Sequence, residues 1–127
     1  MPYKIQYNDD EGIVTVTYSG VVTDDDLLNS LKEKTRDVER VKSCKFSVND
    51  FTKATKFKVT PEGMQENALI SIELSKLNNK VMPILIAPTD LEFGMSRIWE
   101  AYSDETKWNS KIVRTQKDAL ALINKNK

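Results

Sequence analysis

An almost unbroken apolar run at residues 81–87 constrains the fold of this chain more than any other feature. Half-exposed strands alternate apolar and polar residues, whereas a short continuous apolar run is typical of a strand buried on both faces. Such strands occur mainly in parallel sheets with helices on each side. The run therefore predicts an internal strand of a parallel sheet. Pro83 interrupts it, and because proline has no N–H for the strand ladder, we expect it at a bulge or a sheet edge.

Four other segments show the patterns of strands. Apolar and polar residues alternate over residues 3–7 and 14–18, and the turn-forming residues 8–12 between them predict an N-terminal hairpin. Residues 44–48 alternate in the same way and predict a third strand, while residues 112–113 predict a short fifth one. Together with the apolar run, these segments give five strands.

Four threonines stand where helices are predicted to begin, because a threonine side chain accepts a hydrogen bond from the first helical turn. They are Thr23 (a helix over residues 24–38), Thr60 (a helix closed by Asn78 and Asn79), Thr89 (a helix through Tyr102) and Thr115 (a closing helix through Ile123). In the third helix, spacings of four, three and four predict one buried apolar stripe that leaves Trp99 partly outside. The stripe consists of Leu91, Met95, Ile98 and Tyr102.

The predicted order of elements is ββαβαβαβα. Strands that alternate with helices favour right-handed crossovers onto a mainly parallel five-stranded sheet, with the N-terminal hairpin supplying antiparallel pairing and helices on both faces. The chain has 127 residues, the length of one common domain. We therefore expect residues 1–127 to form a single α/β domain.

Charge and cysteine content limit the partners and the compartment. The 19 basic and 19 acidic residues leave no net field to attract nucleic acid, so we expect no nucleic-acid partner. Cys44 is the single cysteine, which favours a reducing, cytoplasmic environment. No apolar segment approaches the ~20 residues of a membrane span, so we expect no stable membrane insertion.

The chain contains no histidine, which removes the usual general base and the common histidine-containing catalytic triads and dyads. One cysteine without histidine cannot form a tetrahedral zinc site. Asp24, Asp25 and Asp26 fit the start of a helix, where the dipole favours negative charge, better than a cation site. We therefore expect a protein that is not an enzyme and has no catalytic residue, metal or cofactor.

The element order, the segment FGMSRIW at residues 93–99 and the segment ALALI at residues 119–123 resemble the SpoIIAA-like (STAS-type) superfamily, and within it the small stand-alone bacterial branch. The resemblance covers nearly the whole chain. It implies a regulatory module that docks on a protein partner. Members related to anti-sigma-factor antagonists carry a phosphorylatable serine after an Asp-Ser loop, but residues 49–58 contain no Asp-Ser pair, so no phosphosite is carried over.

The polar connection predicted at residues 51–60 is the first candidate site, because open parallel sheets bind ligands outside the carboxyl ends of their strands. Its aromatic and lysine side chains suit an acidic protein partner or a phosphate group. The expected contact residues are Asp50, Phe51, Thr52, Lys53, Lys56, Phe57, Gly94 and Arg97. Alternatively, the phenylalanines fold back onto the core, Gly94 eases helix packing and Arg97 pairs with Asp90 or Glu100.

A second function remains open, because other proteins of this architecture resemble lipid-transfer domains. In that case the second and third predicted helices enclose a small apolar ligand or a lipid tail, lined by Met64, Ala68, Met95 and Ile98. A cavity of about 300 Å³ or more favours this function, whereas a close-packed interior favours docking. Trp99 and Trp108 also suggest an exposed aromatic surface through which the protein self-associates as a homodimer.

Overall fold

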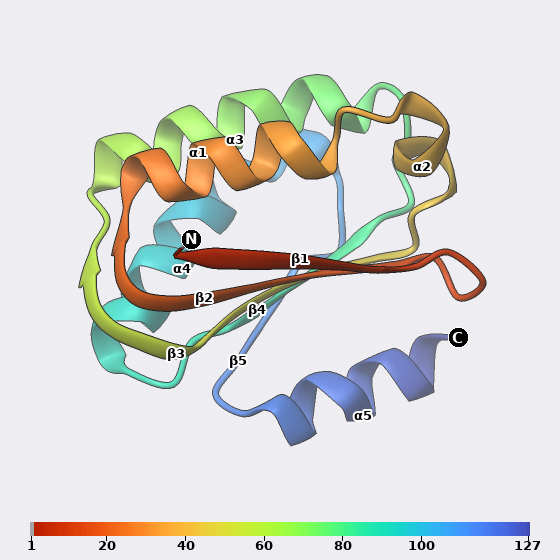
Figure 1. Ribbon diagram of the computed structural model, residues 1–127. Coiled ribbons are helices and arrows are strands. Elements are labelled where there is room, and N and C mark those ends of the chain that lie inside the picture. The colour runs from red at the N-terminus through yellow and green to blue at the C-terminus, as the bar shows by residue number, and fades with distance from the viewer. Residues whose placement is uncertain (1) are drawn as a thin grey trace.

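The computed structural model describes residues 2–127 and contains a central sheet with helices on both faces (Figure 1). The elements are β1 (Tyr3–Asn8), β2 (Ile13–Thr23), α1 (Asp24–Lys34), α2 (Val38–Ser43), β3 (Phe46–Lys58), α3 (Pro61–Ser75), β4 (Met82–Ile86), α4 (Asp90–Tyr102), the short 3-10 helix η1 (Asp104–Thr106), β5 (Lys111–Val113) and α5 (Gln116–Asn126). The predicted order is confirmed, with α2 and η1 added. None of the helices within residues 2–127 has the length and apolar character that a membrane crossing requires.

The strands lie in the order β1-β2-β3-β4-β5. β1 pairs with β2 in antiparallel fashion, and the remaining neighbours are parallel. This confirms the mixed sheet predicted from the alternation of strands and helices. α1 and α3 lie side by side over one face, which α4 also covers, while α5 alone covers the other (Figure 1).

The four threonine caps are confirmed. Thr23, Thr60, Thr89 and Thr115 each accept a hydrogen bond from the first turn of the following helix. The first predicted helix is wrong at its end, however, because α1 stops at Lys34. The Asp37 side chain then accepts hydrogen bonds from two backbone N–H groups and begins the separate helix α2.

The predicted connection at residues 51–60 is wrong, because β3 continues through Lys58. Its distal half pairs in parallel with the end of β2, from Ser19↔Lys53 to Thr23↔Lys58. Beyond Asp50 no β4 residue pairs with β3. Lysine and threonine side chains suit such a solvated edge, and this polar composition is what makes the segment resemble a loop in the sequence.

Pro83 lies in β4 without a bulge, in register with Ser47 of β3. The preceding N–H, that of Met82, donates to the carbonyl of Lys45 on the β3 side at 2.8 Å. Backbone N–H groups alternate sides along a strand, so the nitrogen of Pro83 points away from β3 and toward β5. Pairing with β5 starts only at Ile84, one residue later. Proline occupies a local edge where no strand N–H is needed.

The apolar stripe predicted on α4 is wrong. The buried face of α4 carries Glu92, Ser96 and Trp99, whereas Leu91 and Tyr102 are exposed. Glu92 faces inward because its carboxylate completes the capping box with Thr89. Trp99 faces inward because it fills the space against α3, so the residue predicted to be partly outside is the main anchor of the helix.

Candidate functional site

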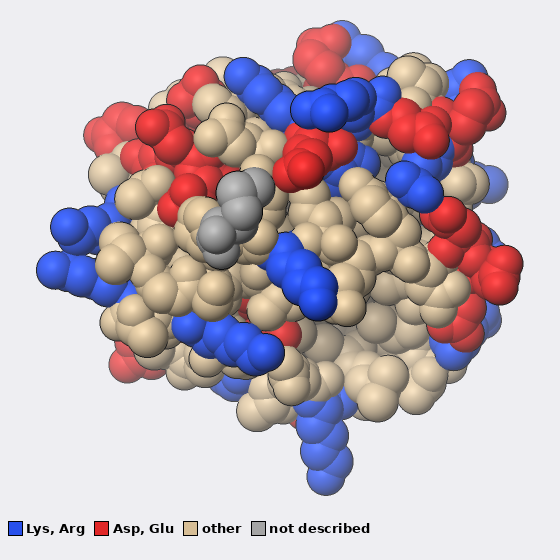
Figure 2. Space-filling model, in the orientation of Figure 1, with Lys and Arg blue, Asp and Glu red and all other residues tan. Residues whose placement is uncertain are grey.

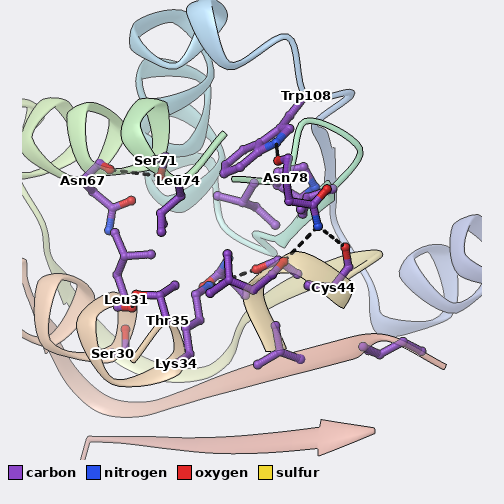
Figure 3. Close-up of a pocket in the computed structure, with 18 of the residues that line it drawn as sticks. Ser30, Leu31, Lys34, Thr35, Cys44, Asn67, Ser71, Leu74, Asn78 and Trp108 are labelled. Atoms are coloured by element: carbon purple, nitrogen blue, oxygen red, sulfur yellow. Dashed lines mark hydrogen bonds between the residues drawn. The ribbon is translucent and has the colours of Figure 1, made fainter. Parts of the chain in front are cut away.

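A cavity lies between α1, α3 and the face of the sheet that these helices cover (Figure 3). Its volume, counted as the space that the centre of a water molecule can reach, is about 100 Å³. Apolar side chains form most of the wall, among them Leu31 of α1, Leu74 of α3 and Leu85 of β4. Figure 3 shows side chains of α1 and α3 converging from two sides, with Trp108 and Asn78 near one end.

Polar side chains of β3 face this cavity at positions where a buried strand normally carries apolar ones. Ser47 and Asn49 line the cavity, whereas their neighbours Phe46 and Val48 point to the α5 side. The alternation of the strand makes this difference, because successive side chains lie on opposite faces. One strand thus contributes a polar wall to the cavity and an apolar wall to the other core.

Tyr18 of β2 connects the sheet to α1 at the cavity wall. Its hydroxyl lies 2.6 Å from the Ser30 hydroxyl and donates to the Asn49 side-chain oxygen at 3.4 Å. Burial raises the pKa of Tyr18 well above its ordinary value, so the phenol stays neutral. Tyr18 is therefore a hydrogen-bonded structural residue rather than an acid or base near neutral pH.

Lys34, the last residue of α1, extends into the cavity (Figure 3) and donates to the Ser47 hydroxyl at 2.9 Å. Burial lowers the pKa of its ammonium to about 8, and the nearby Cys44 thiol opposes this only partly. Burial likewise raises the pKa of the Cys44 thiol. Within residues 2–127, no carboxylate forms an ion pair with Lys34.

The polar groups on the α3 side are satisfied within the chain. Trp99 donates its indole N–H to the Asn67 side-chain oxygen at 2.9 Å, and the Asn67 amide nitrogen donates to the carbonyl of Leu27 at 3.4 Å. The Ser71 hydroxyl donates to the carbonyl of Asn67 at 3.0 Å. These bonds hold α1, α3 and α4 together. Lys34 differs from these residues because its ammonium has no charged partner within the described chain.

Asn78 and Trp108 close one end of the cavity. The Asn78 amide nitrogen donates to three backbone carbonyls around the end of α2, including those of Val41 at 2.9 Å and Cys44 at 2.8 Å. The Trp108 indole N–H donates to the carbonyl of Asn78 at 2.8 Å. Trp99 is buried and Trp108 is half-buried, so neither forms the exposed aromatic surface considered from the sequence.

A charged groove on the surface meets the cavity near the tip of the N-terminal hairpin. The groove and the cavity share Tyr7, Lys34 and Arg40 in their walls. The Arg40 guanidinium lies 3.8 Å from the centre of the Tyr7 ring and donates two hydrogen bonds to the Asp9 carboxylate, both at 2.9 Å. The charges of Arg40 and Asp9 therefore offset each other where the cavity approaches the solvent.

Two of the predicted contact residues are buried and are therefore wrong as a docking surface. Asp50 is 4% exposed, and its carboxylate accepts hydrogen bonds from the Thr52 N–H at 2.9 Å and from Gln116 at 2.7 Å. Phe51 is 1% exposed and packs its ring between Tyr18 and Phe57, with ring centres 5.0 Å apart in both pairs. Phe51 and Phe57 fold back onto the core, which was the alternative expectation from the sequence.

The other predicted contact residues are exposed, except for the half-buried Phe57, but they lie on two elements. Thr52, Lys53 and Lys56 lie on β3, while Gly94 and Arg97 lie on α4. Within residues 2–127, no hydrogen bond or ion pair joins Arg97 to β3. The expected partner Asp90 pairs instead with Arg114 at 3.0 Å. A Cβ added to Gly94 meets nothing within 4 Å, so this glycine does not ease helix packing.

The cavity also differs from the one considered from the sequence, because it lies between α1 and α3 rather than between α3 and α4. Met64 lines it, as expected. Ala68 is buried in the core, and Met95 and Ile98 pack at the margin of that core, so none of these three forms the wall. A sequence signal for Lys34 exists, because it follows Leu27 and Leu31 at helical spacing and thus continues the buried stripe of α1.

Two of the three aspartates at the start of α1, Asp24 and Asp26, have structural roles. The Asp24 carboxylate accepts hydrogen bonds from the Thr60 N–H at 2.8 Å and from the Thr60 hydroxyl at 2.6 Å, which ties the start of α1 to the start of α3. Asp26 completes the capping box with Thr23. Within residues 2–127, no group of three or more histidine, cysteine, aspartate and glutamate side chains is placed to hold a metal ion.

Acidic and basic side chains are mixed over the molecular face that Figure 2 shows, with uncharged side chains between them. This face has no strong long-range field, because charges of opposite sign offset one another and salt screens what remains beyond about 10 Å.

No family model matches the sequence, and no curated protein sequence matches it. Among solved structures, the chain is similar to an uncharacterised protein of the DUF3478 family from Shewanella loihica PV-4, which is described as having a SpoIIAA-like fold. The two share 13% sequence identity with a TM-score of 0.55, over 95% of this chain and 91% of that chain. The protein therefore has a SpoIIAA-like fold, as the resemblance implied, and the likeness concerns the fold alone.

Proposed function

We propose that this protein binds a small molecule in the cavity between α1, α3 and the sheet and does not transform it. The observation that carries the proposal is an internal cavity with apolar walls and a polar side chain, Lys34, that lacks a charged partner within the described chain. Small-molecule sites combine these two features, since apolar walls supply affinity and a few polar groups fix orientation.

The size of the cavity limits the ligand. At about 100 Å³ it is smaller than the roughly 300 Å³ of a typical ligand site and closer to an engineered cavity of about 150 Å³ that holds benzene. A whole lipid does not fit this volume. The proposed ligand is a molecule about the size of a benzene ring or a chain of a few carbons.

The reactive groups that face the cavity favour binding over catalysis. Because burial raises the pKa of Cys44, its thiol stays protonated near neutral pH and is a poor nucleophile. Tyr18 stays neutral for the same reason. Lys34 is mostly protonated at pH 7, so its amine lacks a free electron pair for attack.

Chemical-shift mapping with benzyl alcohol tests the proposal. In the isotope-labelled protein, we expect the amide signals of α1, α3 and the cavity side of β3 to shift together, with a single saturating dissociation constant. The variant Leu74→Trp fills the cavity and is expected to weaken binding about tenfold or more. The matched control Leu120→Trp, on the exposed side of α5, is expected to bind like the wild type. Shifts confined to the surface, or equal binding by both variants, contradict the proposal.

Docking of an acidic protein segment is a second candidate, and the free edge of β3 favours it. Beyond Asp50, β3 pairs with β2 on one side and with no strand on the other, and it exposes Lys53 and Lys56 there. Lysines also protect edges from unwanted pairing, which is the competing explanation. An acidic, strand-forming peptide is expected to shift the amides of residues 52–58 at low salt and to lose this effect with Lys53→Glu/Lys56→Glu. Sedimentation of the wild type and of the Lys53→Glu/Lys56→Glu variant tests whether the protein self-associates through this edge.

A further inference from the structure

We propose that the ligand of this cavity is a small monocarboxylate and that Lys34 is the residue that pairs with its negative charge. The inference rests on the proposed function, because it names the chemical class that the same cavity selects. It is argued from the bonding of the Lys34 ammonium, the charges around it and the shape of the wall.

The Lys34 ammonium has unused bonding capacity. It carries three N–H donors, and within residues 2–127 one hydrogen bond is formed, to the Ser47 hydroxyl at 2.9 Å. Lys34 is half-buried, and a charged group that loses part of its hydration without gaining a charged partner is destabilised, since neutral hydrogen bonds replace only part of what is lost. An anion that enters the cavity restores this lost interaction, which gives a carboxylate an advantage over a neutral molecule of the same shape.

The charges around the cavity leave one positive charge without a partner. Among the cavity-lining residues, the charged ones are Lys34, Arg40 and Asp9. Arg40 and Asp9 pair with each other through two hydrogen bonds, whereas Lys34 has no such partner in the described chain. Cys44, which acts on Lys34, and Tyr18, which lines the same cavity, are held in their neutral forms by burial, and Tyr7 also lines this cavity. Glu33, Arg36 and Asp37 line the outer groove, whose wall Lys34 shares, but they do not line the cavity, and neither carboxylate forms an ion pair with Lys34.

The rest of the wall selects the body of the ligand and the number of its charges. Leu31, Leu74 and Trp108 offer apolar surface to a short aliphatic or aromatic body. One lysine matches a single negative charge, whereas a phosphate group needs several strong donors, usually including arginine. The small volume also favours a carboxylate with a few carbons over a phosphorylated compound.

Lys34 is still protonated when the ligand must bind. With a pKa of about 8, roughly nine in ten molecules carry the ammonium at pH 7. A bound carboxylate then raises this pKa, because an adjacent negative charge favours the charged form of an amine. Ligand binding is therefore coupled to proton uptake in the range around pH 8.

Titration with matched pairs of probes tests the inference. The probes are benzoate against benzyl alcohol and pentanoate against 1-pentanol, followed by the amide shifts of the cavity residues at pH 7. We expect the wild type to bind each carboxylate about tenfold or more tightly than its alcohol, as a charge-assisted hydrogen bond in a buried site suggests. Lys34→Met is expected to lose at least this factor for the carboxylates and to keep its affinity for the alcohols.

Lys32→Met is the matched control, because Lys32 lies on the same helix and is exposed. It is expected to behave like the wild type with all four probes. The assignment of Lys34 is overturned if the wild type binds carboxylates and alcohols equally, or if Lys34→Met binds carboxylates as tightly as the wild type. In either case the cavity still binds small molecules, but without selecting a negative charge. If none of the four probes shifts a cavity amide, the cavity is not a binding site and both proposals fall.

Discussion

The two faces of the sheet solve the same packing problem in different ways. On the α5 face, one helix covers an apolar cluster of strand residues with Ala119 and Ile123. The buried carboxylate at the end of that face, Asp50, is paired with Gln116. On the other face, α1, α3 and α4 enclose a larger core that contains the cavity and the Lys34 ammonium. The α5 face therefore combines apolar packing with one buried carboxylate whose hydrogen bonds are satisfied within the chain.

Most polar groups on the cavity face bond within the chain and stabilise the fold, whereas Lys34 has no charged partner within residues 2–127. β3 shows the difference between the faces within four consecutive residues, because Phe46 and Val48 pack on the α5 face while Ser47 and Asn49 line the cavity. A cavity with a buried charge costs free energy twice, through lost van der Waals contacts and through lost hydration. A ligand that fills the cavity and pairs with Lys34 recovers both.

The largest effect is expected on the close-packed face. Ile84 of β4 is fully buried there, and its truncation in Ile84→Ala leaves a void that its neighbours cannot fill. We expect a loss of about 3–5 kcal/mol in the free energy of unfolding, measured by urea denaturation. If the loss is below 1 kcal/mol, the α5 face is loosely packed and the contrast between the faces disappears.

A smaller effect is expected where α1 and α3 are tied together at one end of the cavity face. A Cβ added to Gly63 collides with the Asp24 carboxylate, which holds Thr60. Gly63→Ala is therefore expected to cost about 1–3 kcal/mol, although alanine is the better helix former. Combining it with Asp24→Ala removes the clash. The double variant is therefore expected to lose less stability than the two single variants lose together. Strict additivity in thermal or urea unfolding contradicts this packing.

The smallest effect concerns Lys34 and depends on pH. Because the folded-state pKa of about 8 lies below the ordinary 10.5, the unfolded chain binds more protons between these values, and the contribution of Lys34 to stability rises with pH in that window. Without ligand, Lys34→Met is expected to be about 1 kcal/mol more stable than the wild type at pH 7, and the wild type becomes the more stable of the two as the pH rises to 9.5. Replacing Lys34 also removes the charge that lowers the pKa of the Cys44 thiol, so this pKa rises further in the variant. A gap that is constant with pH contradicts a buried ammonium.

Most of the framework follows from local chemistry in the sequence. The threonine caps and the apolar run around Ile84 locate the helices and the buried strand, because capping and periodicity act over a few residues. The face of α4 does not follow, since Glu92 faces inward for capping and Ser96 lies inside among larger residues. Periodicity assumes that apolar residues face the core, and this assumption selects the wrong side of α4.

The candidate site is harder to predict because it is made by packing between distant segments. Lys34, Ser47 and Ser71 come from three elements, and only their meeting reveals a cavity. The sequence does contain two local signs of it. Lys34 stands at the next position of the stripe formed by Leu27 and Leu31, and Ser47 alternates with buried apolar residues of β3. A polar residue at a buried position is the signal to follow in such a chain.

A crystal of the protein pressurised with xenon tests the contrast between the two faces most directly, because xenon enters apolar cavities without needing a charge partner. We expect xenon density between α1, α3 and the sheet, beside Leu31 and Leu74, and none between the sheet and α5. We also expect that Leu74→Trp abolishes this density. Xenon bound under α5, or no xenon between α1 and α3, contradicts the account.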